Sequence, residues 1–193
     1  MSRPKPTPSR GLRERLIREN IVYRGNSVDF RADEILLPNG RRAVREYIDH
    51  PGAAAVVPFV TPHTIVLVRQ YRFPVRRTTL EIPAGKLDAG EDPGACLRRE
   101  LREETGYSAG SLRPLITYWP TPAFANEALH VYEAGNLRAG RRNPDEDEFL
   151  EVVAMRFDDA LRLVLTGKIR DSKTVIGLLL CALKRPARAH FTT

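Results

Sequence analysis

The alternation of apolar and polar positions along the chain predicts strands in its first two thirds. NSVDFRADEILLPNG alternates up to a PNG turn at 38–40, and RRAVREYID returns from that turn, which predicts a small antiparallel β unit within residues 21–50. AAAVVPFV (53–60) and TIVLVRQY (64–71) are short apolar runs typical of buried strands. Further strands are predicted in TTLEIP and in the segments 115–119, 128–135 and 151–157.

Helical signals lie between and after these strands. One helix is predicted to begin at an Asp92 cap and to end at Gly106. A second is predicted from an Asp158 cap to Gly167, and a third follows residues 171–172 through KTVIGLLLCALKR. Because strands and helices do not alternate regularly, we expect an α+β fold with a mixed sheet.

Length and composition place the chain among ordinary globular proteins. Its 193 residues, 42% of them hydrophobic and 28% charged, suffice for one main domain with extensions. No apolar run approaches the roughly 20 residues that cross a bilayer, and the N-terminus lacks the apolar segment of a secretory signal. We therefore expect a cytoplasmic protein without membrane contact, in which Cys96 and Cys181 are packed free thiols.

The net charge of +7 is concentrated at the N-terminus. Residues 1–20 hold six Lys or Arg and two Glu, so they contribute +4 of it. With three prolines and no interleaved aromatic residues, this segment predicts a solvated tail, and we expect no nucleic-acid partner. The expected organisation is a disordered basic tail over 1–18, a dimerising β unit over 19–50 and the main domain over 51–188.

A cluster of acids marks the helix predicted after Asp92. Glu100, Glu103 and Glu104 share one helical face at spacings of three and four, where like charges repel one another. Two interpretations are open. The acids could form a solvated face paired with neighbouring arginines such as Arg99, which lies four residues before Glu103. Alternatively, they could be the hard oxygen ligands of Mg²⁺ or Mn²⁺, which would remove the repulsion.

The sequence around these acids resembles the Nudix box. Its fixed positions, in the pattern G-x5-E-x7-R-E-U-x-E-E-x-G-U with U a bulky apolar residue, are filled by Gly85, Glu91, Arg99, Glu100, Glu103, Glu104 and Gly106. The resemblance implies a Nudix-type α/β/α sandwich with a mixed β-sheet, plus the small N-terminal antiparallel unit.

Several motifs outside the box resemble the ADP-ribose pyrophosphatase branch of that superfamily. They are VRQYRFP, LEIPAGK, GKIRDSKT and a proline, Pro122, about 15 residues after the box. The loop that follows this proline departs from the branch pattern, because Ala123 and Asn126 stand where Gly and Asp are common.

The resemblance also implies a set of site residues. Metal ligands are expected among the backbone carbonyl of Ala84 and the carboxylates of Glu100, Glu103 and Glu104, with Arg99 orienting the acids. A glutamate of NPDEDEF, either Glu146 or Glu148, is expected as the general base, although these residues alone also fit an acidic surface loop. The expected substrate contacts are Arg72, Arg45, Glu46 and Glu127.

The function implied is metal-dependent hydrolysis of ADP-ribose to AMP and ribose 5-phosphate. The alternatives are hydrolysis of another nucleoside diphosphate sugar, such as GDP-mannose, and a Nudix-fold binding module without turnover. In the resembling branch the N-terminal hairpin exchanges between subunits, which implies a homodimer.

Overall fold

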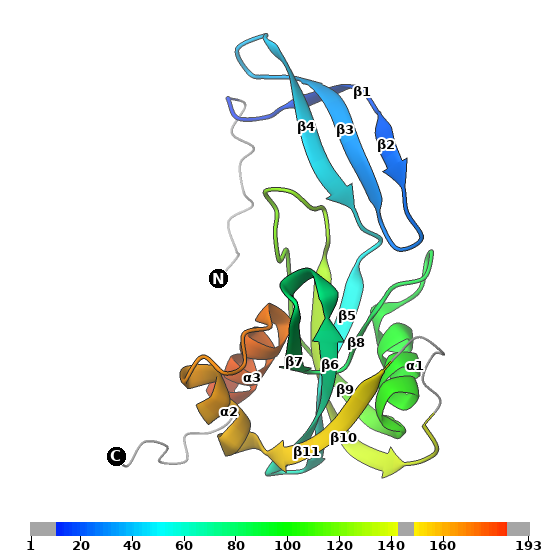
Figure 1. The fold of residues 1–193 in the computed structure, drawn as a ribbon, viewed down its shortest axis with the longest axis vertical. Helices are drawn as coiled ribbons and strands as arrows, with labels where there is room; N and C mark the ends of the chain where they lie inside the picture. Colours follow the sequence, from blue (N-terminus) through cyan, green and yellow to red (C-terminus); the bar gives the residue numbers. More distant parts are fainter. Residues whose placement is uncertain (1–10, 143–148, 185–193) are drawn as a thin grey trace, which may run out of the picture. The chain divides into compact units, whose positions relative to one another are not determined.

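The computed structural model of the chain describes residues 11–142 and 149–184 (Figure 1). These residues form two compact units. One contains the chain up to His50 together with Thr121–Glu127, and the other contains Pro51–Pro120 and the chain from Ala128 onward. The loop 121–127, which interrupts the second unit in sequence, therefore belongs with the N-terminal strands.

The first unit is built on a four-stranded antiparallel sheet. The long strand β3 (Asp29–Leu36) pairs with β1 (Arg15–Arg18) and β2 (Ile21–Arg24) along one edge and with β4 (Arg42–Asp49) along the other. The β3–β4 hairpin turns at Gly40, whose φ of 81° lies in the left-handed region that glycine tolerates. The predicted N-terminal antiparallel unit is therefore confirmed.

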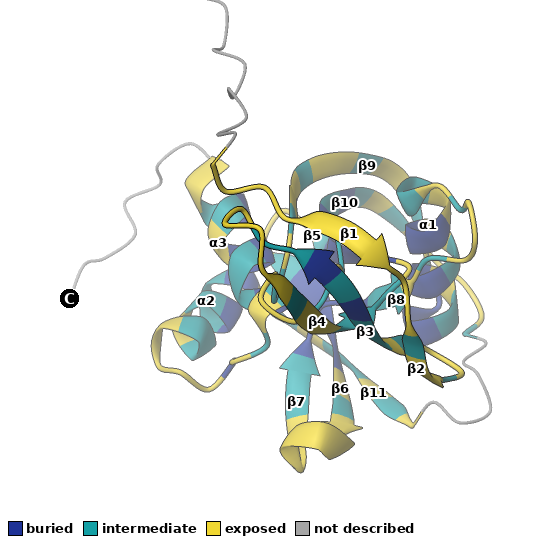
Figure 2. Ribbon diagram, turned by 90° about the horizontal axis from the view of Figure 1, so that it is seen from above, coloured by how far each residue is buried: buried dark blue, intermediate teal, exposed yellow. Residues whose placement is uncertain are grey.

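The predicted disordered tail is too long at its C-terminal end. Arg15 and Leu16 pair with Leu36 and Ile35, so the chain is already in a strand at residue 15. All four residues of β1 are exposed, as Figure 2 shows. A strand held by backbone hydrogen bonds with no buried face leaves no apolar alternation in its sequence, and for that reason the pattern missed it.

The second unit contains a seven-stranded mixed sheet with the order β11-β6-β5-β10-β9. β5 and β10 pair in parallel, the remaining pairs are antiparallel, β7 pairs with β6, and β8 pairs with β5. The strands are β5 (Ala53–Thr61), β6 (Thr64–Arg72), β7 (Arg77–Glu81), β8 (Ala84–Lys86), β9 (Tyr107–Tyr118), β10 (Leu129–Ala139) and β11 (Leu150–Arg156), with a 3-10 turn at Phe73–Val75.

Helices cover both faces of this sheet. α1 (Pro93–Thr105) lies on one face, and α2 (Phe157–Leu165) and α3 (Ser172–Lys184) lie on the other (Figure 1). The predicted α/β/α sandwich is thus confirmed. No helix in the described part of the chain is long and apolar enough to cross a bilayer.

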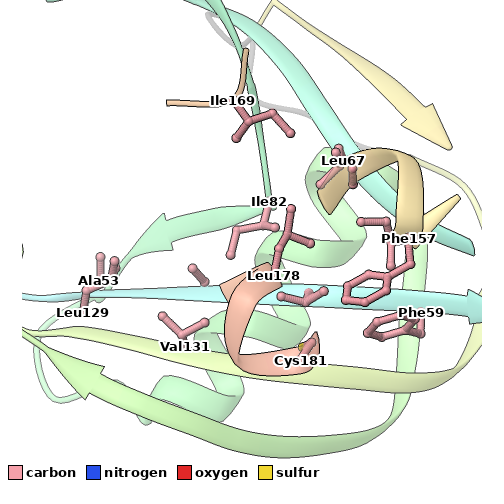
Figure 3. Packing of buried hydrophobic residues seen from close by; sticks show 14 residues of the cluster. Ala53, Phe59, Leu67, Ile82, Leu129, Val131, Phe157, Ile169, Leu178 and Cys181 are labelled. Carbon is pink, nitrogen blue, oxygen red and sulfur yellow. The ribbon is translucent and has the colours of Figure 1, made fainter. Parts of the chain in front are cut away.

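The central strand β5 is buried on both faces, which explains its continuous apolar sequence. Ala55 and Val57 belong to the core cluster that includes Leu178 and Cys181 of α3, shown in Figure 3. The alternate residues of β5, Ala54 and Val56, belong to a second cluster with Cys96, Leu97 and Leu101 of α1. β5 therefore fixes where both helical layers pack.

Two predicted boundaries differ from the structure. α2 starts at Phe157 rather than after an Asp158 cap, because the Phe157 ring is buried against Phe59, with ring centroids 5.2 Å apart, and its backbone N–H donates to His63. β9 begins at Tyr107, eight residues before the predicted start. Its polar, partly exposed sequence lies at the end of the strand order, where pairing with β10 and not burial holds it in place.

Candidate active site

The loop before α1 is fixed by contacts at both ends. β8 pairs with β5, and Leu87 donates to the carbonyl of Gly52, which holds the loop against the sheet. At the other end the Asp92 carboxylate accepts hydrogen bonds from the N–H groups of Gly94 (2.9 Å) and Ala95 (3.1 Å), as the predicted N-cap does. The helix that carries the glutamate cluster therefore begins at a defined point beside β8.

Two of the clustered glutamates are buried against β8. Glu100 and Glu104 are 9% and 3% exposed. The Glu100 carboxylate occupies the space where a side chain of Gly85 would lie, so a Cβ at residue 85 would overlap it. Glu104 accepts a hydrogen bond of 3.3 Å from the N–H of Ala84. The structure thus brings three of the expected metal ligands, Ala84, Glu100 and Glu104, to one place.

Arg99 holds the acids together. It donates to Glu91 (3.1 and 3.3 Å), to Glu100 (2.7 Å) and to Glu103 (3.3 Å), so the predicted Arg99–Glu103 pair is present. The hydrogen bonds to Glu91 raise the pKa of Arg99, and the charge of Glu100 raises it further. Glu91 also accepts from the N–H of Asp88 at 3.1 Å, which ties the loop to the helix.

This arrangement argues against a fully solvated acid face. A solvated ion-paired face would expose its carboxylates, but Glu100 and Glu104 are buried. Among the residues that the structure describes, no three His, Cys, Asp or Glu side chains form a ready metal cluster. Glu100 and Glu104 instead bring two carboxylates against the backbone of β8, and such hard oxygen ligands suit Mg²⁺ or Mn²⁺. The residues present therefore fit a divalent cation.

Sequence reasoning missed one residue of this region, Glu81. Its side chain is 2% exposed and accepts two hydrogen bonds from Arg72, Nε to Oε1 at 2.9 Å and Nη2 to Oε2 at 2.7 Å. It also accepts from the Thr79 hydroxyl at 2.6 Å and from the Lys173 ammonium. Burial raises the pKa of Glu81, but the hydrogen bonds from Arg72 and the charge of Lys173 outweigh burial and lower it to about 2. The sequence signal that could have found Glu81 is that it is the only charged residue of the predicted strand TTLEIP.

Arg72 lies within electrostatic reach of the candidate metal ligands. The hydrogen bonds to Glu81 raise the pKa of Arg72, and the charges of Asp171 and Glu104 add to this increase. Its side chain remains 44% exposed. The expected phosphate-binding arginine therefore lies in the same unit as the glutamate cluster, with a partly exposed side chain.

The remaining expected contacts lie elsewhere in the chain. Arg45, Glu46 and Glu127 belong to the first unit. Arg45 donates to Glu14, and because neighbouring residues of a strand point to opposite faces, Arg45 and Glu46 face opposite sides of their sheet. Glu146 and Glu148 lie outside the described residues. The roles of all five stay predictions.

The loop residue Asn126 explains one departure from the branch pattern. Its amide Nδ2 donates to Asp49 at 2.5 Å, and its Oδ1 accepts from the N–H of His50 at 2.7 Å. An aspartate at residue 126 would place a second carboxylate against Asp49 and would repel it. Asn126 therefore complements Asp49 and ties the loop 121–127 to the end of β4.

The chain is similar to known proteins over most of its length. Residues 49–176 match the NUDIX domain family. The ADP-ribose pyrophosphatase of Bacillus subtilis (strain 168) is 39% identical over 183 residues, 94% of this chain and 99% of the relative. The methanol dehydrogenase activator of Bacillus methanolicus is 41% identical over 167 residues, 86% of this chain and 90% of the relative. A crystal structure of an ADP compounds hydrolase has a TM-score of 0.76 at 23% identity, covering 88% of this chain and 92% of that one, and shows the fold alone.

The low pKa of Glu81 predicts a pH-dependent contribution to stability. Its carboxyl has an ordinary pKa of 4.5 and a pKa of about 2 in the fold, so its stabilisation is complete above pH 4.5 and is lost as the pH falls toward 2. This difference in pKa corresponds to a contribution of ~3 kcal/mol at most to the free energy of unfolding. In Glu81→Gln, urea unfolding should show a flatter decline between pH 4.5 and 2.5 than in the wild-type protein.

The control for this experiment is Glu151→Gln, because Glu151 has a 64% exposed side chain paired with Arg69. It should keep the wild-type decline. An unchanged decline in Glu81→Gln would contradict the proposed cause.

Proposed function

Because the chain belongs to the Nudix hydrolase family and is a Nudix pyrophosphohydrolase, we propose that it hydrolyses ADP-ribose to AMP and ribose 5-phosphate. The observation that carries this proposal is the similarity to the ADP-ribose pyrophosphatase of Bacillus subtilis along almost the whole of both chains. The box residues support it, since its fixed positions are intact and its buried glutamates meet the backbone of β8.

We assign the metal site to Glu100, Glu104 and the carbonyl of Ala84, with Glu103 as a further ligand or partner held by Arg99. A bound Mg²⁺ or Mn²⁺ would screen the charge of the diphosphate and lower the pKa of a bound water. Arg99 keeps the carboxylates oriented through its hydrogen bonds to Glu91, Glu100 and Glu103.

Substrate handling is assigned to the residues that the resemblance implies. Arg72 binds the non-bridging oxygens of the diphosphate, for which a guanidinium edge is well shaped. A loop glutamate, Glu146 or Glu148, takes a proton from the attacking water, which adds in line to one phosphorus while the bridging oxygen leaves with the other phosphate. Further substrate contacts are proposed for Arg45, Glu46 and Glu127.

The substrate is tested with a panel of ADP-ribose, GDP-mannose and nucleoside triphosphates, each with Mg²⁺ and with Mn²⁺. We expect the highest kcat/KM for ADP-ribose, because a site that hydrogen-bonds the hydroxyls of its terminal ribose discriminates against GDP-mannose, which carries a different terminal sugar, and against triphosphates, which carry none. The measurement is product release followed by chromatography. If GDP-mannose exceeds ADP-ribose by about tenfold or more, the alternative substrate class replaces the proposed one.

The metal assignment predicts the effect of removing single charges. Glu100→Gln and Glu104→Gln should each lower kcat by about a hundredfold or more, because each removes a ligand charge. Excess EDTA should abolish activity, and added Mg²⁺ should restore it. Glu151→Gln is the matched control, an exposed glutamate outside the site, and should keep wild-type activity. Full turnover in EDTA, or in either box variant, would show that the metal site is placed wrongly.

A second candidate function comes from the other relative. The similarity to the methanol dehydrogenase activator of Bacillus methanolicus favours a role in activating a methanol dehydrogenase. Adding the protein to that dehydrogenase and following its turnover tests this role. Glu104→Gln is then added in place of the wild-type protein. Loss of activation would show that activation needs hydrolysis, and unchanged activation would show that it needs binding alone.

We also propose that the protein is a homodimer formed through the first unit. Tyr23, Phe30 and Val44 lie on one face of its sheet, as the pairing of β2, β3 and β4 requires, and they are 66%, 38% and 55% exposed. A small sheet that exposes apolar side chains on one face is typical of an interaction surface. A second copy of the chain is the partner that the resemblance implies.

If the apolar face of the first unit forms the dimer interface, Val44→Lys should disrupt the dimer. Glu34 lies opposite Val44 on the neighbouring strand, so a lysine keeps a favourable cross-strand pair while it charges the apolar face. Light scattering should give twice the chain mass of 21.8 kDa for the wild-type protein and a single chain mass for Val44→Lys. Leu165→Lys, at an exposed position of α2, is the control and should stay dimeric. A monomeric wild-type protein at micromolar concentration would refute the dimer.

A further inference from the structure

Glu81 is held by groups from three parts of the second unit. Besides Arg72 at the end of β6, it accepts from Thr79 of β7, from the Gln70 amide at 3.4 Å, and from Lys173 in the first turn of α3. Glu81 and Lys173 have side chains only 2% and 12% exposed. Because Glu81 is buried and accepts from four side chains, its carboxylate is held in one orientation.

Lys173 is itself anchored. Its ammonium donates to Asp171 at 2.9 Å, and Asp171 accepts from the backbone N–H of Thr174 at 3.0 Å and from the Thr174 hydroxyl at 2.5 Å. The same hydroxyl accepts from the N–H of Ile82 at 2.8 Å. The start of α3 is therefore tied to the end of β7, and the two acids and two bases of this group balance in charge.

Arg72 uses one edge of its guanidinium for this group. Nε and Nη2 donate to the two oxygens of Glu81, so the planar guanidinium is fixed side-on. Within the described residues Nη1 donates to no partner, and the side chain is 44% exposed although its carboxylate partner is buried. The anchored edge contacts Glu81, and the edge that carries Nη1, which we call the open edge, has no protein partner among the described residues.

We propose that Glu81 and Lys173 are positioning residues of the active site, which hold the guanidinium of Arg72 side-on so that its open edge meets the diphosphate. This inference rests on the proposed function, because it takes a diphosphate as the ligand of Arg72. Glu81 fixes the plane of the guanidinium, and Lys173 fixes Glu81. An arginine that is oriented before the substrate arrives loses less side-chain entropy on binding.

The test is a cycle of Glu81→Gln, Arg72→Ala and the double variant, assayed on the conjugate that the wild-type protein hydrolyses fastest. Glu81→Gln alone should lower kcat/KM roughly ten- to a hundredfold, the effect expected of losing one charged hydrogen-bonding partner. In the Arg72→Ala background the same change should have almost no effect, because no guanidinium remains to be positioned. A merely structural glutamate would lower kcat/KM by the same factor in both backgrounds, and that result would overturn the proposal.

Lys173 is tested in the same way. Lys173→Met should lower kcat/KM less than Glu81→Gln, Lys173→Arg should restore most of the loss, and neither change should matter when Arg72 is alanine. If Glu81→Gln does not fold, as judged by circular dichroism, Thr79→Val takes its place in the cycle, because it removes one donor to Glu81 and leaves the charges intact.

A second readout does not depend on turnover. The Nε–H of Arg72, identified as the signal absent from Arg72→Ala, should exchange slowly with solvent in the free wild-type protein and rapidly in Glu81→Gln. Inorganic pyrophosphate should shift this signal without releasing it from protection. Rapid exchange in the wild-type protein would refute the proposal even if ADP-ribose is hydrolysed. Slow exchange with no hydrolysis of any conjugate would instead refute the proposed function.

Discussion

The second unit depends on the burial of two like charges on one turn of α1. Glu100 and Glu104 are buried against β8, where water cannot screen the repulsion between their carboxylates as it would on a surface. Several neighbouring features follow from this constraint. Residue 85 must be glycine because the Glu100 carboxylate fills the space of a side chain. Arg99 must reach three acids, and Glu91 must hold Arg99 from the loop side.

The same constraint makes the nearby cysteine unreactive. Burial raises the pKa of Cys96, and the negative charges of Glu100 and Glu91 raise it further, to about 12. A thiol with this pKa stays protonated at neutral pH and packs as a small apolar group. Cys96 accordingly belongs to the core cluster of α1, and both cysteines are free and buried, as composition had led us to expect.

Two buried carboxylates, Glu81 and Asp33, share one arrangement: each accepts hydrogen bonds from donors of more than one element. Glu81 is bound by Arg72 and Lys173, and Asp33 in the first unit accepts from the N–H of Asn20, from Arg31 and from the Tyr47 hydroxyl. Burial raises the pKa of Asp33, but these hydrogen bonds lower it below its ordinary value. Such groups join elements that are far apart in sequence, so they specify which elements meet.

How much the sequence determined depended on how local the interactions are. The box is contained in 23 consecutive residues, 85–107, and its spacing on a helix was enough to predict the Asp92 cap, the Gly106 end and the Arg99–Glu103 pair, because helical geometry fixes which residues are neighbours. The apolar run of β5 likewise predicted a buried strand, since burial on both faces leaves its mark on every residue. Only the tertiary structure showed that Glu81 is bound by Lys173, 92 residues away, that Asn126 complements Asp49 and that β1 begins at Arg15. These features arise from pairings between distant segments, in which a single polar residue or an exposed backbone edge carries the interaction and leaves no periodic pattern in the sequence.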